Sequence, residues 1–298
     1  MKEIAMEIKS INQIHQAYGL DKPTNPLISI IDMKHFVVKD EWLNVKYTNS
    51  FYCVFLKDGS CGLDYGRNTY DFDEGVLSFM APGQVYSVKS KPNREIKGWM
   101  LYFHPELIRN TTLGKEIDRY GFFSYQVHEA LHLSQQEQSA ITDCIKVIKQ
   151  EILERIDRHS NTVVVSALGL LLNLCRRFYE RQFNTRSSSN KDVLSQVESS
   201  LKDFYHSDQG GLPTVSYLAK KVHLSPGYLS DLLRNETGKS AKEHINLFII
   251  DKAKTVLLNS NATVSEIAFG LGYEYPQHFS KIFKLKTGMS PGSYRKVN

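Results

Sequence analysis

Basic side chains gather at the C-terminal end of this 298-residue sequence. From Asn190 onwards there are 14 Lys and Arg residues against 10 Asp and Glu residues, so this part carries four of the five net positive charges. The stretch from Pro276 to Asn298 has no acidic residue, and its basic residues are Lys281, Lys284, Lys286, Arg295 and Lys296. Such a cluster suits contact with phosphate groups, although a solvated basic tail has the same composition. We expect Lys284 and Arg295 to contact nucleic acid.

A pattern with catalytic potential is His-Glu-Ala-Leu-His at 128–132. On a helix it would place two histidines one turn apart to bind zinc, with the glutamate as general base. However, Ser134 and Glu137 form a capping box that begins a new helix directly afterwards, and the residues before it look extended or irregular. A closely spaced pair of histidines that could bind iron or another metal together with a carboxylate is also missing, since His35 and His104 are isolated. The sequence predicts no catalytic residue, metal or cofactor.

Aromatic residues in the N-terminal half are candidates for a small-molecule site. The candidates are Phe51, Tyr65, Tyr70, Phe79, Tyr86 and Trp99. Aromatic side chains commonly line ligand pockets, but packing in the core explains most of these residues equally well.

Short strands separated by turn residues account for residues 27 to 103. The predicted strands are Leu27–Asp32, Phe51–Leu56, Val76–Met80, Val85–Val88 and Ile96–Phe103. Many short strands with Gly and Pro between them indicate an all-β barrel or sandwich.

Helical periodicity replaces this pattern from Ser134. Isoleucines recur on one stripe of an amphipathic helix, at positions 141, 145, 148, 152 and 156. A second apolar helix is predicted over 161–183, and the two should form an antiparallel hairpin. Residues 184–190 are polar and are expected to be a linker.

The sequence has the composition of a soluble globular protein with room for two cores, at 41% hydrophobic residues. No N-terminal stretch has the pattern of a secretion signal, and the longest apolar run, 163–175, is interrupted by polar residues. The four cysteines, Cys53, Cys61, Cys144 and Cys175, lack metal-ligand spacing and suit buried free thiols. We therefore expect a cytoplasmic protein without a membrane segment.

The C-terminal region repeats itself at an offset of 49 to 50 residues. Leu218-Ala219 returns as Ile267-Ala268, and Thr237-Gly238 returns as Thr287-Gly288. Each copy reads as a short helix containing alanine, a tight turn, and a second helix opened by proline. This order is typical of a helix-turn-helix unit, in which the alanine allows close packing of the two helices.

Between the copies, Ala241 to Leu258 predicts one amphipathic helix that spans about 27 Å at about 1.5 Å per residue. Such a strut could hold two recognition helices near the roughly 34 Å separation of successive major-groove faces of DNA. Capping boxes at Ser240/Glu243 and Thr263/Glu266 mark two of the helix starts, and Gly272 suits the second turn.

The region from Lys191 to Asn298 resembles the DNA-binding domain of AraC/XylS transcription regulators. The resemblance rests on Leu218-Ala219, Leu-Ser-Pro at 224–226, Ile267-Ala268, Phe279-Ser280-Lys281-Ile282-Phe283-Lys284 and Ser290-Pro291 through Tyr294-Arg295. Residues 27–110 more loosely resemble the cupin-like N-terminal domain of that family, through Pro82-Gly83-Gln84 and the run from Gly98 to Pro105.

The resemblance implies that base contacts come from the second helix of each unit. Carried over by position, the contacting residues are Gly227, Ser230, Asp231, Gln277, His278 and Lys281. The first unit departs from the family pattern, which often has a large aromatic and a basic residue where this chain has Gly227 and Asp231. Solvent exposure alone is the alternative for Gln277 and His278, and phosphate contact is the alternative for Lys281.

The expected architecture is α+β: a cupin-like sensing barrel at 1–133, a helical hairpin at 134–183 that dimerises, a linker at 184–190, and a double helix-turn-helix domain at 191–298. The expected function is transcription regulation by a homodimer that binds promoter DNA, with a small-molecule effector and RNA polymerase as further candidate partners. The alternative is a metal-dependent cupin-type enzyme fused to a DNA-binding module.

Overall fold

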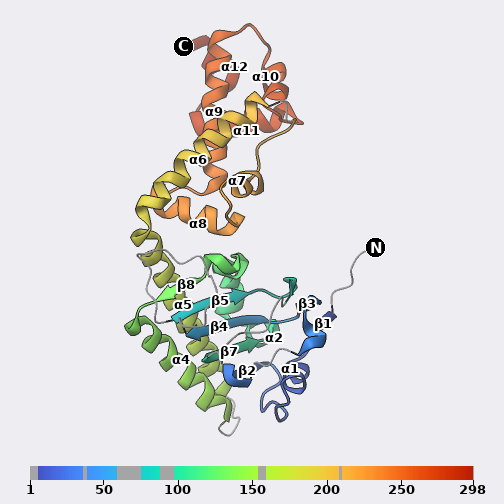
Figure 1. Cartoon of the computed structure of the whole chain (residues 1–298). Coiled ribbons are helices and arrows are strands. Elements are labelled where there is room, and N and C mark those ends of the chain that lie inside the picture. The colour runs from blue at the N-terminus through green and yellow to red at the C-terminus, as the bar shows by residue number, and fades with distance from the viewer. Residues whose placement is uncertain are drawn as a thin grey trace. The chain divides into compact units, whose positions relative to one another are not determined.

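The computed structural model describes residues 6–35, 39–58, 75–87, 97–153, 159–207 and 210–297. The chain divides into two compact units, Met1–Arg186 and Ser187–Asn298. The first unit mixes strands and helices, and the second is helical (Figure 1). The segment expected to be a linker is helical on both sides of Arg186, which separates α5 (Ser160–Thr185) from α6 (Ser187–His206).

Two sheets form the β part of the N-terminal unit. The larger sheet is antiparallel, in the order β2 (Ile28–Asp32), β7 (Gly98–Phe103), β4 (Tyr52–Asp58), β5 (Gly75–Met80) and β8 (Leu131–Leu133). The smaller sheet has the order β1 (Met6–Ile8), β3 (Lys46–Asn49) and β6 (Tyr86–Ser87). The mixed α and β class is confirmed, but the described strands form two separate sheets and do not show the expected closed barrel.

The predicted strands correspond to β2, β4, β5, β6 and β7, with residue 88 of the fourth prediction and residue 96 of the fifth outside the described residues. The sequence did not predict β1, β3 and β8, which are short. In the larger sheet, Cys53 lies opposite both Met80 and Tyr102. Because side chains alternate along a strand, these three residues share one face of the sheet, together with Phe55 and Met100.

The two long helices of this unit are α4 (Gln135–Leu153) and α5, which contact each other and the sheet. The predicted stripe on α4 is buried at 141, 145, 148 and 152, whereas residue 156 lies outside the described residues. The capping box is confirmed, since the Ser134 amide donates to Glu137 Oε2 over 3.0 Å and the Glu137 amide donates to Ser134 Oγ over 3.3 Å. The apolar face of α4 therefore packs inwards.

α5 is long and apolar enough to cross a membrane by length and composition. Leu168, Leu171 and Leu172 on this helix are completely buried inside the unit. Core packing accounts for its apolar character, as is usual for the central helix of a globular domain.

Short helical segments complete the N-terminal unit. They are α1 (Ile11–Ala17), α2 (Pro105–Ile108) and α3 (Thr112–Glu116), with 3-10 turns at Met33–His35, Asp40–Trp42, Ile117–Arg119, Gly121–Ser124 and Val127–Glu129. α1 begins with a capping box between Ser10 and Gln13 and borders a cavity in this unit.

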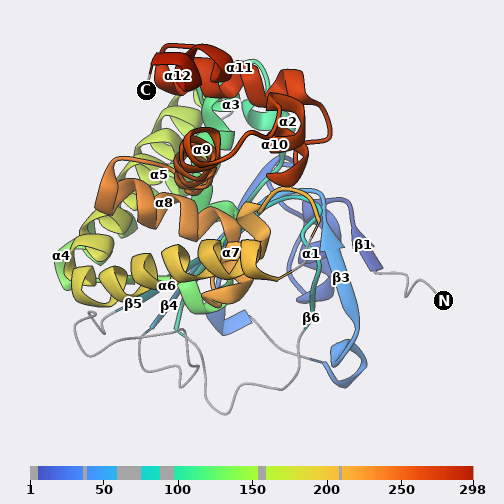
Figure 2. The ribbon, with the colours of Figure 1, turned by 90° about the horizontal axis from the view of Figure 1, so that it is seen from above.

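The C-terminal unit contains α6, α7 (Val215–Lys221), α8 (Pro226–Thr237), α9 (Ala241–Asn259), α10 (Val264–Gly270), α11 (Pro276–Thr287) and α12 (Pro291–Val297). The predicted repeat is present as α7–α8 and α10–α11, and the predicted strut is α9. Figure 2 shows α6 beside α7 and α8. The sequence did not predict α6.

The positions that the sequence predicts for the prolines, the alanines and the turn glycine of the two helix-turn-helix units are confirmed. Pro226 and Pro276 each occupy the first turn of the second helix. Ala219 and Ala268 are buried where the helices meet. Gly272 has φ +94°, a backbone conformation that glycine adopts without the steric cost of a Cβ.

Candidate nucleic-acid interface and ligand cavity

The second helices of the two units, α8 and α11, are built alike. Each has twelve residues, begins with proline, and ends at a glycine with positive φ, Gly238 or Gly288. At the start of α8 the Tyr228 amide donates to Ser225 Oγ over 3.2 Å, which satisfies one of the free amides of the first turn. The proline at the start and the glycine at the end therefore fix the length and direction of each helix.

On α11 the predicted contact residues are all exposed. They are Gln277, His278, Lys281 and Lys284. The opposite face holds Phe279 and Phe283, which are completely buried. The ring of Tyr275, just before the helix, lies 5.6 Å from the ring of His278. α11 therefore presents hydrogen-bonding and positively charged groups to solvent while two phenylalanines anchor it.

On α8 the predicted residues Gly227, Ser230 and Asp231 are half-buried. Asp231 Oδ1 forms an ion pair with Arg234 Nη1 over 2.7 Å, one helical turn further on. Arg234 is exposed and stands 50 residues before Lys284, so both recognition helices carry a basic residue at the equivalent place. Sequence reasoning missed Arg234, although the repeat offset would have found it.

Arg295 has structural partners that the sequence did not suggest. Its Nε donates to the Leu257 carbonyl over 2.9 Å and its Nη2 donates to the Ala262 carbonyl over 2.7 Å. These bonds tie α12 to the end of α9 and the loop that follows. A guanidinium at the end of a helix satisfies carbonyls that lack partners within the helix. Arg295 therefore has a structural role in this unit, and its expected contact with phosphate stays a prediction.

A cavity of about 770 Å³ lies in the N-terminal unit, on the face of the larger sheet that carries Cys53 and Tyr102. β1, β3, β6 and α1 supply its other walls. Its aromatic and sulfur-containing lining residues are Met6, Tyr18, Met33, Trp42, Tyr47, Cys53, Phe55, Phe79, Met80, Tyr86, Met100 and Tyr102. The charged lining residues, Glu7, Lys39, Glu41 and Lys57, are exposed or half-buried.

The hydroxyl, thiol and amide groups that line the cavity are neutral. Burial raises the pKa of Tyr18 to about 12 and raises the pKa values of Tyr86, Tyr102 and the Cys53 thiol above their ordinary ranges. Asn49, which is 3% exposed, directs its Nδ2 at Met80 Sδ over 3.4 Å and at Cys53 Sγ over 3.7 Å. Sulfur is a weak acceptor, and the side chain of Asn49 also hydrogen-bonds the side chain of Tyr86.

Among the aromatic residues proposed from the sequence, Phe79 and Tyr86 line the cavity. Phe51 is completely buried against Tyr102 in the adjoining core and is not a lining residue. Trp99 lies on the other face of β7, because it is one residue out of phase with Met100 and Tyr102. Tyr65 and Tyr70 lie outside the described residues. Most of the lining was missed, since α1, β1 and β3 were not predicted.

The His-Glu-Ala-Leu-His string is not helical. His128 and Glu129 lie in a 3-10 turn, whereas His132 belongs to β8. The expectation that this segment is not a continuous helix is confirmed. Within the described ranges there is no group of three His, Cys, Asp or Glu side chains that could hold a metal ion. Cys53, Cys144 and Cys175 are buried free thiols, and Cys61 lies outside the described residues.

Comparison with known proteins gives matches in both units. Residues 49–172 match the AraC-like ligand binding domain, and residues 218–297 match a helix-turn-helix domain family. The transcriptional regulator YisR of Bacillus subtilis is 32% identical over 270 residues, which cover 83% of this chain and 86% of YisR. The Msm operon regulatory protein of Streptococcus mutans is 33% identical over 127 residues, 43% of this chain, and the match spans only 44% of that relative.

Among solved structures, the C-terminal domain of the response regulator YesN from Fusobacterium nucleatum is 28% identical, with a TM-score of 0.32. The match covers 35% of this chain and 98% of that one. The relatives are transcription regulators, and the alternative of a metal-dependent enzyme is not supported. The chain belongs to the AraC/XylS family of helix-turn-helix transcription regulators.

Proposed function

We propose that this protein is a one-component, non-enzymatic regulator in the cytoplasm that binds promoter DNA through α8 and α11. The observation that carries the proposal is the pair of equivalent capped helices, each with a buried apolar face. α11 offers Gln277, His278 and Lys281 to base edges, and Arg234 and Lys284 stand at equivalent places for phosphate. Amide, imidazole and ammonium groups at the start and middle of such a helix suit contact in the major groove.

The experiment is enrichment of random duplex DNA by the purified full chain, followed by affinity measurement on the enriched and on scrambled sequences. A protein that binds the enriched sequence at least about a thousandfold more tightly than scrambled DNA supports sequence-specific recognition. Equal affinity for both would leave only nonspecific phosphate binding and would contradict the proposal.

We further propose that the cavity binds an uncharged, amphipathic effector. Its deep surface is aromatic and thioether-rich, and its buried polar groups are hydroxyls and one amide, so a charged ligand would lose its hydration without gaining a counter-charge. β5 lies between the cavity and the helices. Ser78, Phe79 and Met80 all border the cavity, and the ring of Phe79 lies 4.3 Å from that of Phe122 and 6.1 Å from that of Tyr179. Movement of this strand on ligand binding would therefore reach α5.

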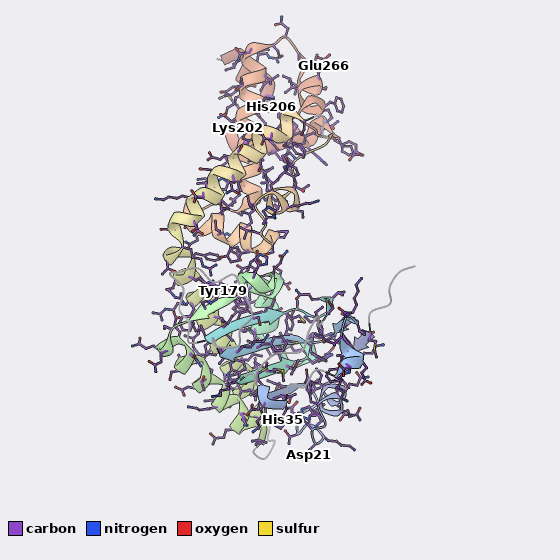
Figure 3. All side chains as sticks on the ribbon, in the orientation of Figure 1. Asp21, His35, Tyr179, Lys202, His206 and Glu266 are labelled. Carbon is purple, nitrogen blue, oxygen red and sulfur yellow. The ribbon has the colours of Figure 1, made fainter. Side chains whose placement is uncertain are left out.

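The contact of α5 with the sheet is polar as well as aromatic. The Tyr179 hydroxyl donates to the Glu129 carbonyl over 3.1 Å, and Gln182, completely buried, accepts from the His132 amide over 2.8 Å. Figure 3 labels Tyr179 on this helix. Since α5 ends immediately before Arg186, we propose that effector binding changes DNA affinity through this end of the helix.

A melting-temperature screen of neutral, cationic and anionic small molecules tests the effector proposal. Neutral compounds should stabilise the wild type and should fail to stabilise Ser78→Trp, in which an indole enters the cavity. Val85→Trp is the matched control, because Val85 is 57% exposed and does not line the cavity. Stabilisation only by charged compounds, or equally in both variants, would contradict the proposal.

We propose domain boundaries at 1–133 for sensing, 134–183 for the hairpin, 184–190 for the junction and 191–298 for DNA binding. The hairpin is proposed to form a homodimer, and RNA polymerase is a candidate partner at the promoter. From the sequence, Ile145 and Ile152 could lie at a dimer contact or pack only against the second hairpin helix. They are 5% and 9% exposed within one chain, which supports packing against α5. Exposed apolar residues on the hairpin are Val147, Leu153, Val163 and Leu170, and we assign the dimer contact to them.

A further inference from the structure

We propose that α6 is a brace that fixes the spacing and the rotational phase of the two recognition helices, with Asn190 and Tyr205 as its positioning residues. The inference rests on the proposed DNA-binding function and adds a determinant of specificity outside both recognition helices. α9 is the covalent connection between the two helix-turn-helix units, whereas α6 makes a second, noncovalent connection between them.

The first end of α6 is attached to the first unit. Asn190 is 3% exposed, and its Nδ2 donates to Glu236 Oε1 over 2.8 Å. Glu236 belongs to the last turn of the recognition helix α8. Along the middle of α6, Val197, Leu201 and Phe204 are buried, and the ring of Phe204 lies 5.1 Å from that of Tyr217 on α7. α6 is therefore packed on the first unit over most of its length.

The other end of α6 reaches the second unit. The Tyr205 hydroxyl donates to the Leu271 carbonyl over 3.1 Å, and Leu271 caps α10 at the turn that leads to α11. The ring of Tyr205 lies 6.0 Å from the ring of Phe248 and 4.9 Å from Lys252 Nζ, both on α9. Tyr205 thus joins α6, the strut α9 and the second turn at one point.

The backbone that follows α6 adds to its contact with the second helix-turn-helix unit. Gly211 lies against Gly272 so closely that a Cβ on Gly272 would overlap the Gly211 carbonyl. From residue 190 to residue 205, α6 rises about 22 Å at about 1.5 Å per residue. Figure 1 shows α6 running from α8 towards α10 and α11, and Figure 3 labels Lys202 and His206, which are exposed on α6.

A brace of this kind has a consequence on DNA. Each base pair inserted between the two contact regions moves the second region by about 3.4 Å along the axis and turns it by about 35°. Two helix-turn-helix units that are connected by both α9 and α6 cannot adjust to this new spacing and rotation without breaking a contact. Two units connected by α9 alone could adjust by bending of α9. The brace therefore predicts a strict preference for one spacing.

The test uses the full chain and the enriched duplex, together with derivatives that carry one base pair inserted or deleted between the two protected regions. The wild type should lose about tenfold in affinity on either derivative. Tyr205→Phe and Asn190→Ala each remove one attachment, so their spacing penalty should fall to about threefold, while affinity on the original duplex changes by less than about twofold. Melting temperatures establish that each variant is folded.

Tyr217→Phe is the matched control, because Tyr217 also contacts Phe204 and its hydroxyl makes no hydrogen bond to a described residue. It should keep the full tenfold penalty. If folded Tyr205→Phe and Asn190→Ala both keep that penalty, or lose affinity equally on all three duplexes, the brace is wrong while the proposed function stands. A wild type that binds no DNA would instead overturn the proposed function together with this inference.

Discussion

His223 and Gly272 occupy the same place in the two helix-turn-helix units, and both have a left-handed backbone, with φ +56° and +94°. A bulky side chain is accommodated at the first of these turns. At the second turn the Gly211 carbonyl occupies the space that a Cβ would need. The two units therefore share a backbone conformation but differ in how closely another segment approaches it.

Gly272→Ala should cost about 2–5 kcal/mol of unfolding free energy, because left-handed backbone strain and overlap with Gly211 add together. Gly288→Ala is the control: its φ is +82°, but nothing lies within 4 Å of the place that an added methyl would occupy, so it should cost only about 1–2 kcal/mol. His223→Gly should change stability by less than about 1 kcal/mol. Urea unfolding of the full chain measures all three, and equal costs at 272 and 288 would contradict the steric argument.

Lys281→Ala should weaken binding to the enriched DNA by about 1–3 kcal/mol, and should lower the salt dependence by about one counterion if the ammonium contacts phosphate. Asp231→Ala removes an acidic group and releases Arg234 from its ion pair. Its overall affinity should stay unchanged or rise slightly, while preference at one base position relaxes. DNA affinity measured across a salt series compares the two variants. If Lys281→Ala binds DNA as tightly as the wild type while a folded Asp231→Ala does not bind, α8 makes the principal DNA contact.

Arg295→Ala should reduce stability by about 1.5–3 kcal/mol, because two carbonyls lose a charged donor at the end of α9. Lys296→Ala, which removes an exposed neighbouring charge, should change stability by less than about 0.5 kcal/mol. Thermal unfolding distinguishes the two. If Arg295→Ala keeps the wild-type melting temperature but lowers the salt dependence of DNA binding, phosphate contact is the main role of this side chain.

Helices with strong local signals could be predicted from the sequence, and the reason is visible at their ends. Capping boxes begin α4, α9 and α10, and in each of them the donor and the acceptor lie three residues apart: Ser134 with Glu137, Ser240 with Glu243, and Thr263 with Glu266. α6 was missed because its first turn is polar and resembles a linker. Its stripe of Val197, Leu201 and Phe204 has helical spacing, but the partner of Asn190 is 46 residues away.

The cavity and the partners of Arg295 could not be predicted. The cavity depends on the register that places Cys53 opposite Met80 and Tyr102, and on short elements without periodicity such as β3. A basic residue near a chain end has the same appearance in the sequence whether its partner is a phosphate or a backbone carbonyl. Contacts between distant segments decide both cases.

Stability should fall at high pH because of Tyr18, whose burial raises its pKa from 10.0 to about 12. Above pH 10 the unfolded chain loses this proton while the folded chain keeps it. The folded state then binds more protons, so the unfolding free energy decreases as the pH rises from about 10 to about 12 and is unaffected by this group below that range. Urea midpoints between about pH 8 and 11 should fall less steeply for Tyr18→Phe. Parallel profiles for the two proteins would contradict the assignment.

Two chains should meet on the exposed apolar surface of α5. Leu170 and Val163 lie seven residues apart on this helix and are 55% and 39% exposed, whereas Ile145 on α4 is 5% exposed. Leu170→Asp should therefore give a folded monomer, because the carboxylate stays hydrated in one chain and would be buried in the dimer. Ile145→Asp should instead lose about 3–5 kcal/mol of stability, because its carboxylate is forced into the packing between α4 and α5. Light scattering measures association and thermal unfolding measures folding. A monomeric wild type would overturn the proposed homodimer, and a Leu170→Asp variant that remains dimeric would place the contact elsewhere.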